Sequence, residues 1–266
     1  MMVHNQPVYL CTGYETERGF FMNIIPYGPS GRIAVSHIQM AGSRHQNCQQ
    51  PCEDAVFLRV TGDFLFCGLA DGQSGAAYGA EGGRACLEAI GEYLEEVGIE
   101  ALLSAPFPDE LPCTITRVFR KRLLELSQKD PWKDFASTLL AIAVDLKTGQ
   151  YALLHLGDGC ALSVSPDAEP GILSGPEQGL SLHHTWLTTS DNAVSHLRLS
   201  FGRLQGRKRL LLLSDGAVCL CRGQNIPWRA KELLKTGTRD QLHQYLLQSK
   251  PADDATCILL DCTEDP

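Results

Sequence analysis

Three apolar runs of strand length in this chain each lead into an Asp-Gly pair, either directly or after one small residue. A strand that stops at such a pair carries a carboxylate to the rim of a buried sheet and leaves bare backbone beside it. Asp-Gly is also the commonest two-residue turn of a β-hairpin, so each pair has a second, purely structural interpretation. The three pairs are Asp71-Gly72, Asp158-Gly159 and Asp215-Gly216.

The residues that follow each pair separate the two interpretations. Asp71-Gly72 is followed by a Gly/Ser loop and then by a helical pattern from about Tyr78, which a hairpin does not explain. Asp158 is followed at once by another strand-like run, residues 161–165, which favours a hairpin turn there. The sequence therefore predicts a chemical role for Asp71 and leaves Asp158 open between a turn residue and a ligand.

The remaining pattern predicts the fold class. Apolar residues recur at helical spacing in two segments, and Thr238 with Gln241 forms a capping box before a third helix. About eight strands, mostly joined by hairpins, together with separate helical stripes predict an α+β fold. We expect a four-layer α-β-β-α sandwich of two antiparallel sheets flanked by helices. The expected strands include residues 33–38, 55–60, 137–146, 150–156, 209–213 and 256–261, and the expected helices are 78–97, 114–128 and 239–248.

In two stretches the apolar residues recur at neither helical nor strand spacing. Gly and Pro interrupt residues 1–30, and we predict an N-terminal extension there, with one domain over residues 31–266. Within the extension, Val8-Tyr9-Leu10 and Phe20-Phe21-Met22 are each long enough for an edge strand or a clasp. Between Pro166 and Gly206 the residues Gly, Pro, Ser and His are frequent, which predicts a mobile functional loop or lid.

Charge and hydropathy narrow the class of protein. The formal net charge is −8 and no Lys/Arg run forms a basic surface, which argues against nucleic-acid binding and against a two-metal nuclease. No apolar stretch reaches about 18 residues, so we expect no membrane span. The N-terminus also lacks a basic region followed by an apolar one, so no leader segment is predicted. We expect a monomer.

The 11 cysteines are many, but their number is odd and they are scattered along the chain. We expect reduced thiols, which fit a cytoplasmic protein. Cys48 with Cys52, or Cys219 with Cys221, are conceivable zinc ligands. Neither pair has a second pair at the spacing of a zinc site, so structural zinc is not predicted.

Acidic residues stand at or beside five strand ends, and as a group they predict a metal site. Carboxylates gathered in this way would repel one another unless a cation lay between them. A site built only from oxygen ligands favours magnesium or manganese over zinc or copper. Two such ions can bind a bridging water, lower its pKa and clamp a phosphoryl group. The five positions are Glu53-Asp54, Asp71, Asp158, Asp215 and Asp253-Asp254.

An ordered set of short motifs over roughly residues 33–262 resembles the metal-dependent protein phosphatases (PPM, or type 2C). The chain is most similar to the bacterial branch that carries a Pro-Cys-(Gln/Glu)-Asp-Ala motif. The resemblance implies the four-layer sandwich, Mn²⁺ or Mg²⁺ as cofactor, and a phosphoserine or phosphothreonine protein as substrate, in opposition to a Ser/Thr kinase. The matching motifs are Pro51-Cys52-Glu53-Asp54-Ala55, Ala70-Asp71-Gly72, Ser137-Thr138-Leu139, Gly157-Asp158-Gly159, Thr189-Ser190-Asp191-Asn192, Leu213-Ser214-Asp215-Gly216 and Asp253-Asp254-Ala255-Thr256.

The resemblance also implies a role for individual residues. Asp54 and Asp71 would hold a metal pair, with Asp71 bridging, and Asp215 would join them as the third catalytic carboxylate. Asp158 matches the position of a third ion, which it would share with Asp215, and Glu53 would act through water. The loop from Thr188 to Gly202 is similar to the family's flap over the site. The implied metal ligands are Asp54, Asp71, the Gly72 carbonyl, Asp158, Asp215 and Asp253.

Three departures from the family pattern affect substrate handling rather than the ligands. Gln73 stands where many members carry a His that is proposed to protonate the leaving group, and Gln49 stands where many carry an Arg that orients the phosphate. Gly159-Cys160 replaces the usual Ser-Arg. Arg44 and His45, from the same loop as Gln49, are the candidates for contacting the substrate phosphate in its place.

These departures leave a second function open. A regulatory or phosphoprotein-binding pseudophosphatase would keep the metals without efficient turnover, and Gln49 together with Gln73 is the feature that favours it. The intact set of metal-binding aspartates favours the enzyme.

Overall fold

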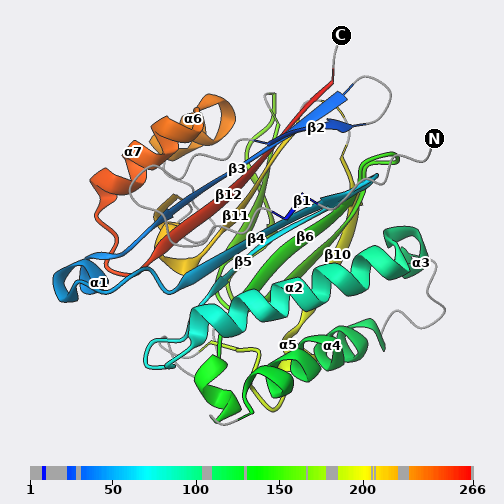
Figure 1. The fold of residues 1–266 in the computed structure, drawn as a ribbon. Helices are drawn as coiled ribbons and strands as arrows, with labels where there is room; N and C mark the ends of the chain where they lie inside the picture. Colours follow the sequence, from blue (N-terminus) through cyan, green and yellow to red (C-terminus); the bar gives the residue numbers. More distant parts are fainter. Residues whose placement is uncertain are drawn as a thin grey trace.

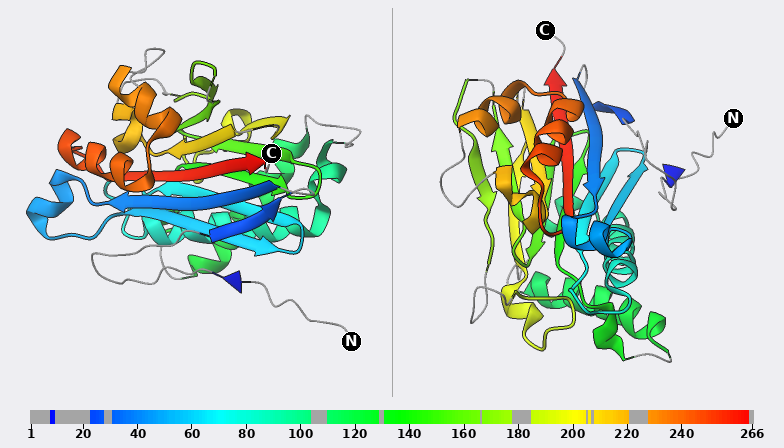
Figure 2. Two further views of the ribbon diagram at one scale, coloured as in Figure 1. Left: turned by 90° about the horizontal axis from the view of Figure 1, so that it is seen from above. Right: turned by 90° about the vertical axis from the view of Figure 1, so that its left-hand side faces the viewer.

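The computed structural model describes residues 8–9, 23–27, 31–103, 110–128, 131–165, 167–177, 185–204, 206, 208–220 and 228–264. Two six-stranded sheets, antiparallel in every observed strand pairing, pack face to face, and helices cover the outer face of each (Figure 1). The two turned views show the helical layers on opposite sides of the sheets (Figure 2). The predicted four-layer α-β-β-α sandwich is therefore confirmed.

The first sheet has the strand order β1-β4-β5-β6-β7-β10, and α2 and α4 pack on its outer face (Figure 1). Phe66 of the sheet, Ile90 of α2 and Phe119 of α4 belong to one buried apolar cluster between them. The strands are β1 (Val8–Tyr9), β4 (Asp54–Thr61), β5 (Phe64–Asp71), β6 (Leu139–Asp145), β7 (Gln150–Leu156) and β10 (Arg198–Arg203). The helices on this side are α2 (Gly79–Val97), α3 (Ile99–Leu103), α4 (Leu111–Leu126), α5 (Ala193–His196) and the 3₁₀ helix η2 (Trp132–Phe135).

The second sheet has the order β2-β3-β12-β11-β8-β9, with α6 and α7 outside it. The predicted capping box begins α7: Thr238 accepts from the Gln241 backbone N–H, and the Gln241 side chain accepts from that of Thr238. The strands are β2 (Asn23–Tyr27), β3 (Gly31–Met40), β8 (Cys160–Val164), β9 (Gly171–Ser174), β11 (Lys208–Leu213) and β12 (Ala255–Glu264). The helices are α1 (Ser43–Cys48), η3 (Asp215–Leu220), α6 (Trp228–Thr236) and α7 (Arg239–Ser249).

The run of four leucines in β11 shows why the sandwich strands are apolar on both faces. Leu210 and Leu212 point into the core between the sheets, whereas Leu211 and Leu213 point toward α6 and α7. Successive side chains of a strand alternate between faces, so a strand covered on both sides is apolar throughout. The four consecutive leucines therefore fit a strand that is covered by the first sheet on one face and by α6 and α7 on the other.

The strand ends that carry the acidic motifs all lie at one end of the sandwich. Asp54 at the start of β4 pairs with Asp71 at the end of β5, and Leu139 of β6 pairs with Leu156 of β7. In the second sheet, Leu213 of β11 pairs with Cys257 of β12, and the end of β3 reaches the start of β12. Because neighbouring strands run antiparallel, the start of one strand lies beside the end of the next. The strand ends that carry the acidic motifs therefore lie along one edge of the sandwich, which we call the rim.

The hairpin interpretation of Gly157-Asp158-Gly159 is wrong. The segment joins β7 of the first sheet to β8 of the second, so it crosses the gap between the sheets instead of reversing within one. The local pattern of two apolar runs around Asp-Gly is the same in both cases. Only the choice of partner strand, which lies far away in the sequence, separates them.

The expected lack of regular structure between Pro166 and Gly206 is also wrong for the described parts of that stretch, whereas its role as a mobile lid stays a prediction. They contain β9, α5 and β10, and β10 pairs with β7 over its whole length. Thr188 is fully buried, and its backbone N–H donates to the Ser137 carbonyl at 2.9 Å. The strand was hidden because β10 is an edge strand without clean alternation of apolar and polar residues.

Further elements lie where no regular structure was expected. Helix α1 occupies the polar loop before β4, and α6 occupies a stretch expected to be irregular. Strands β1 and β2 fall within the predicted N-terminal extension, and each adds a strand to a sheet. The Phe20-Phe21-Met22 run lies outside the described residues. In the part of the chain that the structure describes, no helix is long and apolar enough to cross a membrane.

Candidate metal centre

Asp54 and Asp71 face each other as direct partners in the β4–β5 ladder. The Asp71 backbone is fixed on its other side by Thr138, whose hydroxyl accepts from the Asp71 N–H at 3.0 Å and whose N–H donates to the Asp71 carbonyl at 2.9 Å. Like charges directly opposite each other destabilise a sheet. This pair therefore costs stability in the metal-free protein.

Asp54 is the most deeply buried of the candidate ligands, at 3% exposure, and neither of its carboxylate oxygens has a hydrogen-bond partner of good geometry. Burial raises the pKa of Asp54 to about 7; the Thr256 hydroxyl opposes this rise and the charge of Asp254 adds to it. Buried polar atoms are almost always satisfied in folded proteins. Two orphaned carboxylate oxygens mark a place that a cation would complete.

Asp71 and Asp215 come from different sheets and meet at the rim. Burial raises the pKa of Asp71 well above its ordinary value, and the charges of Asp54 and Asp215 and a hydrogen bond with Asp215 raise it further. Asp215 is exposed at the surface, and only a partial loss of hydration raises its pKa, while that hydrogen bond lowers it. Asp71 is thus the member of this pair that keeps a proton when no cation is present.

Asp158 belongs to the same electrostatic group. Burial raises the pKa of Asp158 to about 6, and the charge of Asp215 contributes to the shift. The crossing between the sheets therefore brings Asp158 toward the carboxylate that begins η3. Four aspartates from four strand ends interact, and loss of hydration together with mutual repulsion raises the pKa of each.

The donor set fits a hard divalent cation. It consists of carboxylate and backbone oxygens, which magnesium and manganese prefer. Among the described residues, no three Asp, Glu, His or Cys side chains already enclose one point, so water and main-chain oxygen would have to complete the coordination shell. Magnesium sites commonly keep several waters in this way.

Gly72 supplies bare backbone beside Asp71. A Cβ atom at this position would lie 2.8 Å from the Glu53 carbonyl and 3.0 Å from the Ala80 nitrogen in the first turn of α2. The Gly72 N–H donates to the Glu53 carbonyl at 3.2 Å. No backbone N–H among the described residues donates to the Gly72 carbonyl, so that oxygen remains available to an ion.

The two adjacent aspartates before β12 have different surroundings. Asp254 is buried, and its carboxylate accepts from the Gly42 N–H at 2.7 Å, from the Glu53 N–H at 2.5 Å and from His45 Nδ1 at 2.8 Å. These three donors commit Asp254 to the protein. Asp253 is partly exposed: its Oδ1 accepts from the Asp254 N–H at 3.1 Å and its Oδ2 lies 3.2 Å from the exposed Arg44, so it is the member of the pair that an ion can reach.

The family follows from the sequence match. The model of the protein phosphatase 2C family matches residues 41–248, which is more than half of the chain. The chain belongs to the protein phosphatase 2C family. A search of curated proteins finds no match to it.

Solved structures share the fold of this phosphatase 2C chain at low sequence identity. The catalytic domain of the serine/threonine protein phosphatase PstP in complex with two manganese ions aligns with a TM-score of 0.63 and 14% identity, covering 88% of this chain and 100% of that one. The S. agalactiae serine/threonine phosphatase gives 0.61 and 17%, with 88% and 100% covered. RsbX in complex with magnesium gives 0.55 and 14%, with 91% and 100% covered.

In this phosphatase 2C chain the two candidates for the substrate phosphate have different environments. Arg44 is 70% exposed and pairs with Asp253 across 3.2 Å at the mouth of the site. His45 is mostly buried, and its hydrogen bond to Asp254, opposed in part by burial, raises the pKa of His45. Because the Asp254 carboxylate can only accept, His45 Nδ1 carries the proton of this bond.

The two glutamines that depart from the family pattern are both at the surface. Gln49 is exposed and ends α1 with a left-handed backbone (φ 56°). Gln73 is exposed, and its backbone N–H donates to the Ala136 carbonyl at 2.9 Å. Neither side chain is engaged with the carboxylate group, and neither can supply a titratable proton.

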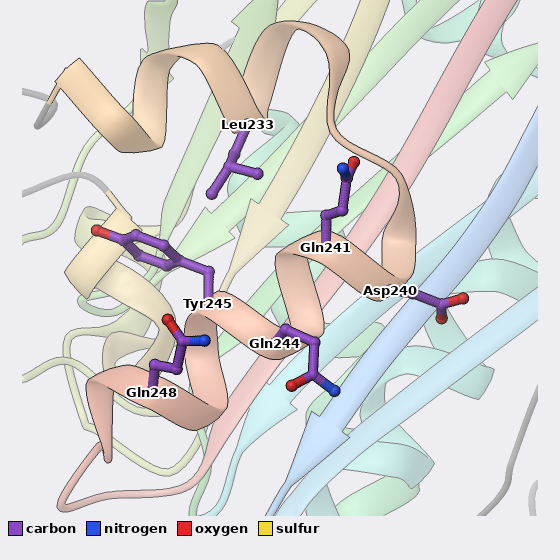
Figure 3. Close-up of a pocket in the computed structure, with 6 residues that line it drawn as sticks. All are labelled: Leu233, Asp240, Gln241, Gln244, Tyr245 and Gln248. Carbon is purple, nitrogen blue, oxygen red and sulfur yellow. The ribbon is translucent and has the colours of Figure 1, made fainter.

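Two sites outside the carboxylate group do not qualify as the centre of this phosphatase 2C chain. Cys48 and Cys52 have free thiols and belong to no metal-binding cluster among the described residues, and Cys221 lies outside them. A pocket between α6 and α7 is lined by residues such as Leu233, Tyr245 and Gln241, none of which is a candidate ligand (Figure 3).

Proposed function

We propose that this protein is a metal-dependent serine/threonine protein phosphatase that hydrolyses phosphomonoesters with Mn²⁺ or Mg²⁺. The observation that carries the proposal is the group formed by Asp54, Asp71 and Asp215: three mutually repelling carboxylates, one of them buried with both oxygens unpartnered. Membership of the protein phosphatase 2C family supports the same activity.

Two ions would be held by Asp54, Asp71 and Asp215, together with the Gly72 carbonyl and Asp253; Asp158 would hold a third ion with Asp215. The fit rests on the orphaned oxygens of Asp54 and on the all-oxygen donor set. Such ions would supply an activated water for attack on the phosphoryl group and would neutralise the charge on that group.

Arg44 is the residue we propose to orient the phosphate, in place of the arginine missing at position 49. Its exposed ion pair with Asp253 is worth little, about 0–1 kcal/mol, so the guanidinium is free to turn to an anionic substrate. A guanidinium fork matches the geometry of a phosphate group. For His45 the geometry favours a positioning role over a phosphate contact, because its ring is engaged with Asp254.

The substrate class is proposed by likeness to PstP and the S. agalactiae enzyme, which are serine/threonine phosphatases. We propose a phosphoserine or phosphothreonine protein as substrate, and a Ser/Thr kinase as the activity it opposes. Gln73 cannot protonate the leaving alkoxide, so the proton must come from another group at the rim.

The test is a hydrolysis assay on matched phosphoserine, phosphothreonine and phosphotyrosine peptides, with manganese, with magnesium and with excess chelator. We expect turnover of the first two peptides that requires added metal. A clear preference for phosphotyrosine contradicts the substrate assignment. Binding of manganese and of a phosphopeptide without turnover contradicts the enzyme and supports the pseudophosphatase, as the glutamines at positions 49 and 73 would then suggest.

A further inference from the structure

The crossing that carries Asp158 is held by Arg198, the first residue of β10. The Arg198 guanidinium donates to the Gly175 carbonyl through Nη1 at 2.7 Å and to the Gly157 carbonyl through Nη2 at 3.3 Å. Its Nε lies 3.4 Å from a Glu177 carboxylate oxygen. One side chain therefore ties the end of β7 to the segment that follows β9, and so links the two sheets.

His155 is the buried residue that contacts Arg198. It lies opposite Arg198 in the β7–β10 ladder and is 1% exposed. Burial and the charge of Arg198 lower the pKa of His155 to about 3, so the imidazole is neutral. Arg198 can only donate, so Nδ1 of His155, 3.0 Å from Arg198 Nη2 and 2.8 Å from the Ser174 hydroxyl, is the acceptor nitrogen.

A second set of contacts fixes the same turn from the other side. The Glu177 N–H donates to the Gly157 carbonyl at 3.0 Å, so this oxygen accepts two hydrogen bonds. The Glu177 carboxylate is 2.6 Å from His196 Nδ1, and the His196 ring stacks on Trp186 with centroids 3.7 Å apart. Gly157 has a φ of 121°, which glycine adopts readily and other residues rarely adopt.

The contacts continue from this turn to the Asp158 carboxylate. The Thr185 hydroxyl lies 3.2 Å from the Glu177 carbonyl and also within hydrogen-bonding reach of the Asp158 side chain, so it can give its single proton to one or the other. The Gly157 carbonyl is therefore anchored by Arg198 and Glu177, and Thr185 lies beside the Asp158 side chain. This placement brings Asp158 near Asp215.

We infer that Arg198 is a positioning residue for the third cation site: by fixing the Gly157 carbonyl it holds the Asp158 carboxylate beside Asp215. The inference rests on the proposed function and extends it to a residue that touches neither the ion nor the substrate. The ion pair between Arg198 and Glu177, with side chains 33% and 29% exposed, contributes little to folding stability by itself. Groups that orient a metal ligand, by contrast, typically change metal affinity about 10–100-fold when they are removed.

The experiment counts Mn²⁺ ions bound to purified, chelator-treated protein, by the loss of the free-ion electron paramagnetic resonance signal during a titration. The test variant is Arg198→Lys, which keeps the charge and loses the planar fork. The matched control is Arg203→Lys, in the same strand, where the arginine donates to the Thr148 carbonyl at the far end of β10.

For the wild type and for the Arg203→Lys control we expect two tightly bound ions and a third, weaker one. For Arg198→Lys we expect the tight pair unchanged and the third ion weakened about tenfold or more. Asp158→Asn is expected to lose the same ion, and the double variant is expected to bind no worse than Asp158→Asn alone, because both changes act on one site.

Three results overturn the inference: a wild type that binds only two ions, an Arg198→Lys variant that binds the third ion normally, or a double variant that also loses the tight pair. If Arg198→Lys does not fold, Glu177→Gln carries the test through the same network, with a weaker third ion expected and unchanged binding contradicting the inference. Ion counting does not depend on turnover. An inactive wild type would therefore contradict the proposed function while the third-site result stayed readable.

Discussion

Asp54 and Asp71 are direct partners across two adjacent strands, in a ladder whose other residues are mostly apolar. Burying two carboxylates opposite each other destabilises the folded chain unless a cation or a proton separates them. Asp215, from the facing sheet, adds a third charge to the same place. Binding of a divalent cation among these carboxylates and the stability of the fold are therefore linked.

The first prediction concerns the stability of the metal-free protein. Asp71→Asn should raise its free energy of unfolding at pH 7.5 by about 1–2 kcal/mol, or several degrees in Tm. At this pH the folded chain must either hold Asp71 protonated, well above its ordinary pKa, or bury a third repelling charge, and Asn avoids both costs. The exposed Asp240→Asn at the start of α7 is the control and should shift Tm little. Thermal melts in excess chelator measure this, and a destabilised Asp71→Asn protein would argue against mutual repulsion.

The second prediction concerns pH. The folded-state pKa of Asp54 is about 7 and that of Asp158 about 6, both above the value of about 3.8 expected for the unfolded chain. Between about pH 4 and 7 these two carboxyl groups bind more protons in the folded than in the unfolded chain, so their contribution to the free energy of unfolding falls as pH rises through this window. His155, whose folded pKa of about 3 lies below its ordinary value, contributes in the opposite direction up to about pH 6.5. The carboxylate effect is therefore measured as the difference between the wild type and Asp54→Asn. Saturating Mn²⁺ favours the ionised carboxylates and should remove the decline.

Urea unfolding at pH 5 and pH 7.5, with chelator and with Mn²⁺, tests this pH dependence. Equal changes in the free energy of unfolding of the chelated wild type and the chelated Asp54→Asn variant between these two pH values contradict the raised pKa of Asp54. The Asp54→Asn variant provides the matched control, because its chelated form should show a smaller decline than the wild type.

The third prediction separates two neighbouring residues of α1. His45→Ala removes a donor from the buried Asp254 and should cost about 1–3 kcal/mol of stability, while loosening the Glu53-Asp54 segment and weakening Mn²⁺ binding. Arg44→Ala removes only an exposed ion pair, so its Tm should stay near that of the wild type while KM for a phosphopeptide rises. If instead Arg44→Ala lowers the stability and His45→Ala raises KM at unchanged stability, the roles of the two residues would be exchanged.

The fourth prediction concerns Asp158 in the reaction. Asp158→Asn should preserve the fold and the tight metal pair, and should reduce kcat more for a phosphoserine peptide than for an aryl phosphate. An aryl oxide leaves readily without protonation, whereas a serine alkoxide does not. Equal activity of wild type and variant on the phosphoserine peptide, at limiting as well as saturating manganese, would assign Asp158 a purely structural role in the crossing.

The layers of the fold could be predicted because the spacing of apolar residues along a helix or strand depends on which of its faces are buried. The alternating leucines of β11, the helical stripe of α2 and the capping box at Thr238 all express local rules. The strand-end position of Asp71 followed for the same reason. Asp54 and Asp71 were predicted separately, but their direct pairing depends on the register of β4 with β5, which no local pattern contains.

What the sequence did not reveal depends on contacts between distant segments. Asp253 and Asp254 are adjacent and chemically identical, and only the donors from Gly42, His45 and Glu53 decide that Asp254 is committed to the protein. Arg198 is an ordinary residue of an edge strand until its contact with the Gly157 carbonyl is known. Such roles arise from tertiary structure, so no motif predicts them.

The central claim is that the carboxylates at the rim form a divalent-cation centre in which Asp71 takes part. The most direct measurement is titration calorimetry of Mn²⁺ into chelator-treated wild type and Asp71→Asn, with folding of both checked by circular dichroism. We predict at least two ions bound by the wild type, and loss of the tight pair in a folded Asp71→Asn protein. Equal binding of Mn²⁺ by the two proteins would contradict the claim.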